Sequence, residues 1–168
     1  MRKLFCILSV TLGLFANYGH ALTDTTKAVL SFYVVSEEKI DGGRLIDTLD
    51  LPKLGYIAAK PDLVITQLVA VSQTVVADGG IYDKDGKQIG RPGPDRAALD
   101  IMIRSEDSRK FEALTKENIG KRVLMMLGDV PLIAPIVQSP ISTQSFQVII
   151  GKHGDPKKIE DGLKKLVP

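Results

Sequence analysis

The chain has 168 residues, with 22 lysines and arginines against 20 aspartates and glutamates, and one cysteine, Cys6. A net charge so close to zero gives no electrostatic reason to expect nucleic acid or an anionic membrane as a partner. A single cysteine excludes an internal disulfide, and no apolar run reaches the roughly 20 residues of a membrane-spanning helix.

Residues 1–21 have the features of a cleavable secretory signal. Arg2 and Lys3 are basic, residues 4–15 are apolar but too short to span a bilayer, and small residues precede the expected cleavage site after Ala21. An uncleaved anchor is the alternative. Cleavage would leave residues 22–168 as one soluble domain with equal numbers of basic and acidic residues, and in a cell with two membranes this domain would lie in the periplasm.

The first half of this domain predicts two strands separated by a long loop. Residues 28–35 are rich in β-branched and aromatic residues, and residues 63–77 alternate, so each predicts a strand, the second bent near Ser72. A helix is the alternative for residues 63–77. Residues 36–57 contain acids, glycines and a proline, which is typical of a surface connection, although long irregular loops also carry binding sites.

Two turn-rich stretches follow. Asp83, Asp85 and Gly86 weakly resemble a calcium loop, but the other oxygen ligands and the closing glutamate are missing, so we expect a solvated turn and no metal. Residues 90–95 predict a loop by their glycines and prolines, and they do not open a helix as a phosphate-binding loop would.

The centre of the chain predicts a strand, a helix and a strand. Residues 97–104 alternate in polarity, Ser105 predicts the N-cap of the helix, Gly120 predicts a left-handed residue after its end, and residues 123–127 predict the next strand. The side chains that face one way in the first of these strands are Leu99, Ile101 and Ile103. A right-handed crossover could place the two strands in parallel.

A hairpin is predicted next. Gly128 and Asp129 fit a two-residue turn, and residues 130–137 return as a strand that contains Pro131 and Pro135. Because proline cannot donate to a sheet ladder, this strand is predicted to lie at a sheet edge.

The chain ends with a strand and a short helix. Residues 145–150 predict the strand, and Asp155 and Pro156 predict the N-cap and the first residue of the helix. The apolar side of this helix consists of Ile159, Leu163 and Leu166. The order β-β-β-α-β-β-β-α predicts an α+β fold, with a single mixed or antiparallel sheet and two helices packed on one face.

Residues 99–151 carry a combined pattern of short motifs. It consists of Lys110, Phe111, Thr115, Glu117, Asn118, Gly120, Lys121, Leu127, Gly128, Asp129, Ala134, Pro135, Pro140 and Ile141. This pattern resembles the head subdomain of the first periplasmic domain of SecD, a subunit of the accessory complex of the bacterial preprotein translocase; residues 28–96 match only in layout. The resemblance implies a domain that contacts exported polypeptide, without the membrane part and second subdomain that would drive export.

Most motif residues are expected to be structural. They are Phe111, Thr115, Asn118, Gly120, Lys121, Gly128 and Pro135. Asn118 could instead contact a ligand, and Lys121 with Arg122 could bind an acidic partner, although both positions suit the end of a helix. Core packing is expected for Met102, Met125 and Met126, with an adaptable binding patch as the alternative.

Catalysis is not expected. His153 is the only histidine of residues 22–168, and this range has no cysteine, which argues against a transition-metal site and against Cys–His chemistry. We therefore predict neither cofactor nor metal and no enzymatic activity. A hydrolase that uses His153 as its base is the remaining enzymatic alternative.

The sequence favours a non-enzymatic interaction domain. We expect it to bind exported or unfolded polypeptide, or an envelope protein, by adding a strand at the edge formed by residues 130–137, with Asp129, Leu132 and Ile136 as candidate contacts. The prolines oppose this hypothesis because they block edge hydrogen bonds. The alternative is a periplasmic small-ligand-binding protein that uses residues 36–59 as a lid. The sequence leaves the oligomeric state open.

Overall fold

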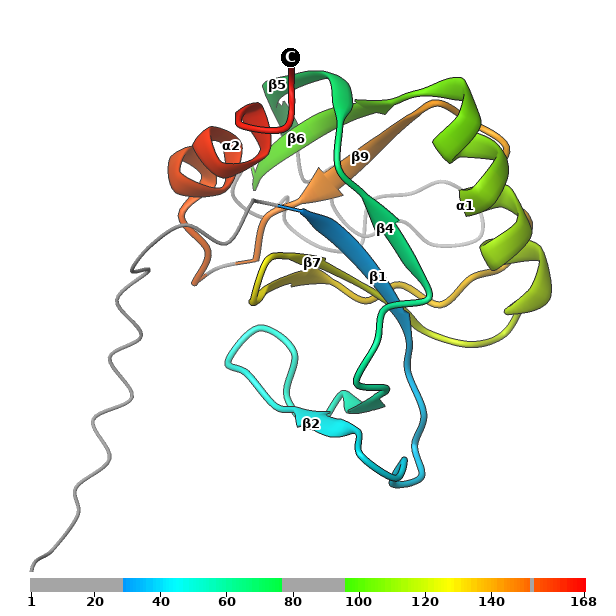
Figure 1. The fold of residues 1–168 in the computed structure, drawn as a ribbon. Helices are drawn as coiled ribbons and strands as arrows, with labels where there is room; N and C mark the ends of the chain where they lie inside the picture. Colours follow the sequence, from blue (N-terminus) through cyan, green and yellow to red (C-terminus); the bar gives the residue numbers. More distant parts are fainter. Residues whose placement is uncertain (1–28, 77–95, 152) are drawn as a thin grey trace, which may run out of the picture.

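The computed structural model describes residues 29–76, 96–151 and 153–168 (Figure 1). In these ranges the elements are β1 (Leu30–Val34), β2 (Arg44–Ile46), β3 (Gly55–Ile57), β4 (Leu63–Ile65), β5 (Leu68–Val76), β6 (Arg96–Ile103), α1 (Ser105–Glu117), β7 (Val123–Leu127), β8 (Val130–Ile133), β9 (Ser145–Ile149) and α2 (Pro156–Lys164). Neither of these helices is long and apolar enough to cross a bilayer. The predicted signal and the turn-rich stretches at 83–86 and 90–95 lie outside the described residues.

The strands form three sheets rather than one. A four-stranded sheet has the order β4-β1-β7-β8, a three-stranded sheet has the order β5-β6-β9, and β2 pairs only with β3. All these pairings are antiparallel, so the predicted α+β class is right, whereas the single sheet is wrong. The parallel arrangement considered for the strands before and after α1 is also wrong, because β6 and β7 belong to different sheets.

The second predicted strand, residues 63–77, is divided between the two large sheets. β4 pairs with β1, and β5 pairs with β6, after a break at Thr66 and Gln67. Leu63 and Ile65 are buried and so is Leu68, so the alternation changes phase at the break. The bend expected near Ser72 therefore lies earlier, and it moves the chain from one sheet to the other.

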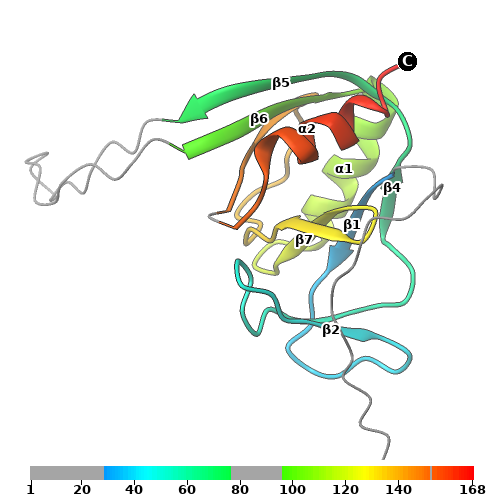
Figure 2. The same cartoon turned by 90° about the vertical axis from the view of Figure 1, so that its left-hand side faces the viewer.

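Figure 1 shows α1 and α2 on opposite sides of the molecule, and Figure 2 shows both at a level between β5–β6 and β1–β7, so they do not together cover one face of a single sheet. Both helices and both sheets contribute to one apolar cluster, which includes Leu30, Ile101, Phe111, Val148 and Leu163. The ring of Phe111 lies 4.9 Å from that of Phe32 on β1 and 5.6 Å from that of Phe146 on β9, centroid to centroid. This one side chain thus contacts both sheets from the helix between them.

A smaller apolar cluster lies on the opposite face of the four-stranded sheet. Its buried members are Ile46, Ile57, Leu124, Met126 and Ala134. Residues 36–57, expected to form a surface loop, contain β2 and β3 and supply two of these side chains. β7 is therefore covered on both faces, which explains why its sequence, Val123–Leu127, is apolar throughout.

The ends of the helices follow the predictions in part. Ser105 is the first residue of α1 and not its N-cap; Arg104 holds the cap position without a side-chain capping bond. Instead, the Nε atom of Arg104 donates to the carboxylate of Asp107 at 2.9 Å. The predictions for α2 and the end of α1 are confirmed: the carboxylate of Asp155 accepts from Lys158 N–H, and Gly120 has a φ of 84°.

The hairpin of β7 and β8 is confirmed. Gly128 in its turn has a φ of 55°, in the left-handed region, and β8 is the last strand of its sheet. Regular strand ends at Ile133, earlier than the predicted 137, and a bulge interrupts the ladder with β7 within β8, between Pro131 and Ile133. Beyond Ile133, Pro135 C=O accepts from Val123 N–H at the start of β7, and Val137 bonds Lys121 and Gly120 just before β7.

Candidate functional site

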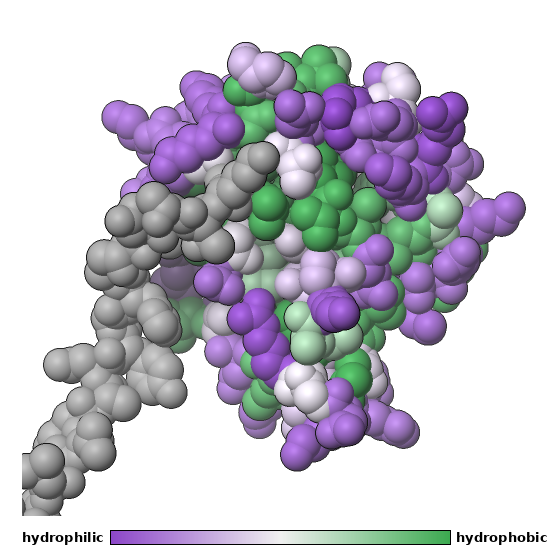
Figure 3. All heavy atoms as spheres, in the orientation of Figure 1, coloured by the Kyte–Doolittle hydropathy of each residue, from purple (hydrophilic) through white to green (hydrophobic). Residues whose placement is uncertain are grey.

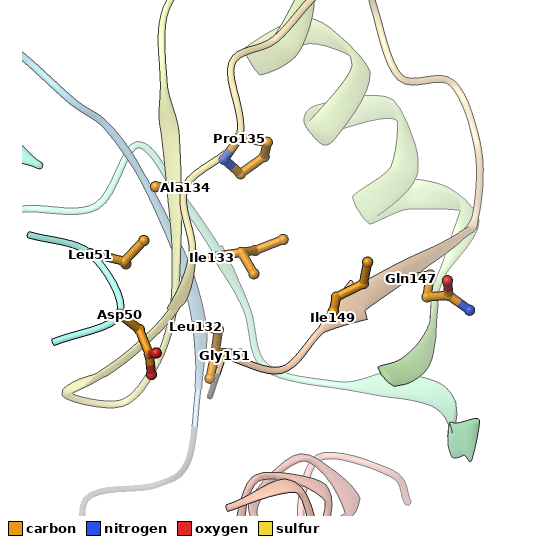
Figure 4. Close-up of a pocket in the computed structure, with 9 residues that line it drawn as sticks. All are labelled: Asp50, Leu51, Leu132, Ile133, Ala134, Pro135, Gln147, Ile149 and Gly151. Atoms are coloured by element: carbon orange, nitrogen blue, oxygen red, sulfur yellow. The ribbon is translucent and has the colours of Figure 1, made fainter. Parts of the chain in front are cut away.

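A groove lies between β8 and β9, the last strands of the two large sheets (Figure 4). Its volume is about 370 Å³, and its lining consists of Asp50, Leu51, Leu132, Ile133, Ala134, Pro135, Gln147, Ile149 and Gly151. The side chains of Ile133 and Ile149 point into the space between the strands. We call this feature the β8–β9 groove; its lining is mainly aliphatic.

A second hollow of about 580 Å³ continues the groove towards α2. It shares Asp50, Leu132 and Gly151 with the groove and reaches His153 and Ile159. The loop that carries Asp50 borders both hollows. The carboxylate of Asp50 accepts a hydrogen bond from the backbone N–H of His153 at 3.4 Å. Residues from the β2–β3 excursion therefore form one wall of this surface.

The exposed apolar side chains elsewhere are distributed over several elements. They include Leu45, Leu49, Val64, Val69, Val75, Met102, Ile119 and Ile136. Figure 3 shows apolar surface towards the middle of one face, with hydrophilic residues around it. Because single exposed apolar residues are ordinary on protein surfaces, the groove is a better candidate site than any of them.

The open edge of β8 is protected against strand addition. The N–H and C=O groups of Met126 point towards β1. The backbone groups of Pro131, which pairs with Met126, therefore point away from β7 to the open edge, where proline has no N–H to donate. Further along, the outward carbonyl of Ala134 accepts from Nη1 of Arg122 at 3.1 Å. The bulge adds a third irregularity, and such devices are typical of edges that stay unpaired.

The three candidate contacts on this hairpin have different environments. Asp129 is exposed at the turn, and its carboxylate lies 3.7 Å from Nη1 of Arg44, a surface pair that contributes little to stability. Leu132 is 7% exposed and belongs to the main core, whereas Ile136 is 48% exposed. Of the three, only Leu132 lines the groove.

The motif residues at the end of α1 bond to nearby backbone. The amide of Asn118 donates to Leu114 C=O at 2.9 Å and accepts from Nζ of Lys121 at 3.2 Å. The hydroxyl of Thr115 is buried and accepts from Ile141 N–H at 2.9 Å. Pro135 C=O accepts from Val123 N–H. The Asn118 contacts are local to the end of α1, whereas Thr115 and Val123 bond the chain between β8 and β9.

Residues 36–57 give no support to a mobile cover over a ligand. Ile57 is completely buried beneath the hairpin, and Tyr56 exchanges backbone hydrogen bonds with Ser36. Met126 belongs to this smaller cluster and Met125 to the main core, while Met102 is partly exposed on β6, so the three methionines do not form one patch.

The described residues bring few ionisable groups together. Within residues 29–76, 96–151 and 153–168, no three His, Cys, Asp or Glu side chains are placed to hold a metal ion. His153 approaches Asp50 through its backbone N–H only, and its side chain is exposed. The lining of the β8–β9 groove includes one acidic side chain, that of Asp50, and one amide side chain, that of Gln147.

The sequence analysis predicted both strands but identified only β8 as a sheet edge; it did not identify β9, predicted as a strand at residues 145–150, as the other edge of the groove. Pro131 and Pro135 mark β8 as an edge strand, because proline lacks a donor. The sequence of β9, Ser145–Ile149, carries no such mark, and its role as an edge depends on its pairing with β6 alone. The only local signal is Thr143, whose hydroxyl bonds both backbone groups of Ser145.

Comparisons with known proteins give similarities of fold only. No model of a known protein family matches the sequence, and no curated protein matches it. A structure of SecDF, described as a membrane component that enhances protein export, matches with a TM-score of 0.50 and 18% identity, over 83% of this chain and 61% of that one. SecDF in its super-membrane-facing form matches with a TM-score of 0.53 and 21% identity, over 83% of this chain and 18% of that one.

A third SecDF structure, from Thermus thermophilus, is 21% identical, but its TM-score of 0.42 is too low to support an argument. The chain thus spans less than two thirds of the length of each SecDF chain that it matches. The resemblance predicted from residues 99–151 is confirmed at the level of the fold: the chain is similar in structure to a portion of SecDF.

Proposed function

We propose that this chain is a non-enzymatic domain of the cell envelope that binds exported or unfolded polypeptide, or an envelope protein, in the β8–β9 groove. The observation that carries the proposal is an aliphatic groove between two strand edges. Extended polypeptide binds to such edges through its backbone and places alternate side chains in adjacent pockets. The similarity in fold to a membrane component that enhances protein export supports the same class of partner.

The proposal places the working chain outside the cytoplasm. Its support is the pattern of residues 1–21, with basic residues followed by a short apolar run and small residues. Fusion of these residues to an alkaline phosphatase that is active only after export should give active enzyme. A cytoplasmic, inactive fusion would contradict this part of the proposal.

Photocrosslinking tests the groove as a binding surface. A photoreactive amino acid at Ile133 or Ile149 should yield covalent adducts with a permanently unfolded, carboxymethylated protein. Lys116, exposed on α1 away from the groove lining, is the matched control position and should yield few adducts. Equal yields at the three positions, or none, would overturn the proposal.

A further inference from the structure

The backbone of β9 alternates between groups that bond β6 and groups that face the groove. Ile150 N–H donates to Ala97 C=O at 2.9 Å, and Ile103 N–H donates to Gln144 C=O at 2.8 Å. In an antiparallel ladder, residues bonded to the neighbouring strand alternate with residues whose backbone groups point away from it. With the register of β6 and β9, the outward positions are Ser145, Gln147 and Ile149.

These three positions are not equivalent. Both outward groups of Ser145 are occupied, since its N–H donates to the hydroxyl of Thr143 at 3.1 Å and its C=O accepts from that hydroxyl at 2.9 Å. For Gln147 and Ile149, no backbone partner on this side occurs among the described residues. Both residues line the β8–β9 groove (Figure 4).

We infer that β9, at Gln147 and Ile149, is the strand that receives an extended polypeptide. The inference rests on the proposed function and identifies the strand that performs it. Two N–H and C=O pairs spaced two residues apart, about 6.8 Å, match the backbone of an extended chain. β8 across the groove offers side chains such as Ile133 but has a protected edge. The bound segment therefore pairs with β9 and places alternate apolar side chains towards Ile133.

Proline substitution tests the outward N–H groups. Gln147→Pro removes an N–H that takes no part in the ladder with β6, whereas Gln147→Ala retains it and removes only the side chain, which bonds Asp100. Ser145→Pro is a second control, because Thr143 already occupies that N–H. The probe is a fluorescent octapeptide of alternating valine and threonine, compared with the same peptide N-methylated along one edge.

Gln147→Pro should weaken binding of the octapeptide by about tenfold, which corresponds to the loss of one hydrogen bond at the upper end of the usual range. Ser145→Pro should bind within about threefold of the unchanged chain, because Ser145 lies outside the groove lining and its N–H is already occupied. Gln147→Ala should bind more tightly than Gln147→Pro, because it retains the N–H, so a loss common to both variants reports the side chain and the difference between them reports the N–H. The N-methylated peptide should bind weakly to every variant.

Amide hydrogen exchange in the unchanged chain provides a measurement that does not depend on the folding of a variant. Addition of the octapeptide should slow exchange at Gln147 and Ile149. Equal binding by Gln147→Pro and Gln147→Ala, or unchanged exchange at both amides in the bound state, would overturn this inference and leave the proposed function standing. Failure of the unchanged chain to bind any extended peptide would overturn both.

Discussion

At the scale of single residues, the hydroxyl of Thr115 joins α1 to the chain that connects β8 with β9. It donates within α1, to the carbonyls of Phe111 and Glu112, and it accepts from Ile141 N–H. A threonine hydroxyl that bonds its own helix is common. The bond from Ile141 differs because it joins distant parts of the chain, and the side chain of Thr115 that accepts it is fully buried. One side chain thus fixes the position of a long connection.

Thr115→Val should lower the free energy of unfolding by about 1–3 kcal/mol, because the isosteric change leaves Ile141 N–H without its partner. Denaturant unfolding measures the loss, and amide exchange at Ile141 should become faster. Thr74→Val in β5, where no side-chain bond is described, should change stability by less than about 0.5 kcal/mol. Unchanged exchange at Ile141 would show that the bond has no structural role.

Residue-level predictions succeeded where the cause is local and failed where it is not. Gly120 was predictable because the end of a helix requires a left-handed residue, and Asn118 because its amide reaches a carbonyl one turn away. Ser105 was predicted wrongly as the N-cap. The start of α1 is held by Arg104, which bonds Glu106, Asp107 and Gln67, and the last of these contacts depends on the tertiary fold.

At the scale of elements, the excursion from residue 36 to residue 57 is part of the packed structure. Ile46 and Ile57 cover the face of β7 that points away from the helices, where Leu124 and Met126 are buried. A strand buried on both faces needs this cover, because exposed Leu124 and Met126 would cost hydrophobic stabilisation.

Ile57→Ala should lower the free energy of unfolding by about 2–5 kcal/mol, the usual cost of truncating a fully buried aliphatic side chain. Leu45→Ala on the paired strand is the control: Leu45 is 54% exposed, so its truncation should cost less than about 1 kcal/mol. Denaturant unfolding distinguishes the two. Equal, small effects would indicate that the excursion is a detached cover, as the small-ligand alternative requires.

The elements that could be predicted are those with a clear period or a marked end. The strands in residues 28–35, 97–104 and 145–150 and both helices were recognisable from alternation, helical spacing and capping residues. β2 and β3 have three residues each, too few for a period to show. The break at Thr66 was missed because residues 63–77 are β-branched on both sides of it, and only pairing with two different sheets divides them.

At the scale of the whole molecule, the candidate site arises from the meeting of two sheets, so no single stretch of sequence contains it. The proline-marked half of the groove, β8, was predictable. The other half depends on which strand ends the three-stranded sheet, a tertiary property. Phe111 links the two halves, since its ring contacts Phe32 in one sheet and Phe146 in the other.

Phe111→Ala should lower the free energy of unfolding by about 3–5 kcal/mol, and both sheets should still unfold in one transition because they share a core. Phe111→Leu retains more side-chain volume, so it should lose less free energy of unfolding. It serves as the test variant if Phe111→Ala does not fold. The unfolding midpoint of each sheet is measured by following amide signals from β1 and from β6 separately through a urea titration. Separate midpoints in Phe111→Leu would show that the sheets are independent units.

The contact between the start of β5 and the last residues has a consequence for the order in which the chain can fold. Leu68 N–H donates to Leu166 C=O at 2.8 Å, and Ile159 and Leu163 of α2 complete the main core. A chain that emerges N-terminus first from a ribosome or a narrow channel lacks these partners until residues 156–166 have emerged. Until then, folding of the earlier segments costs the entropy of closing long loops, and the long-range contacts that would offset this cost are missing. Residues before α2 are therefore expected to reach their final packing only once α2 is available, whichever route the chain takes.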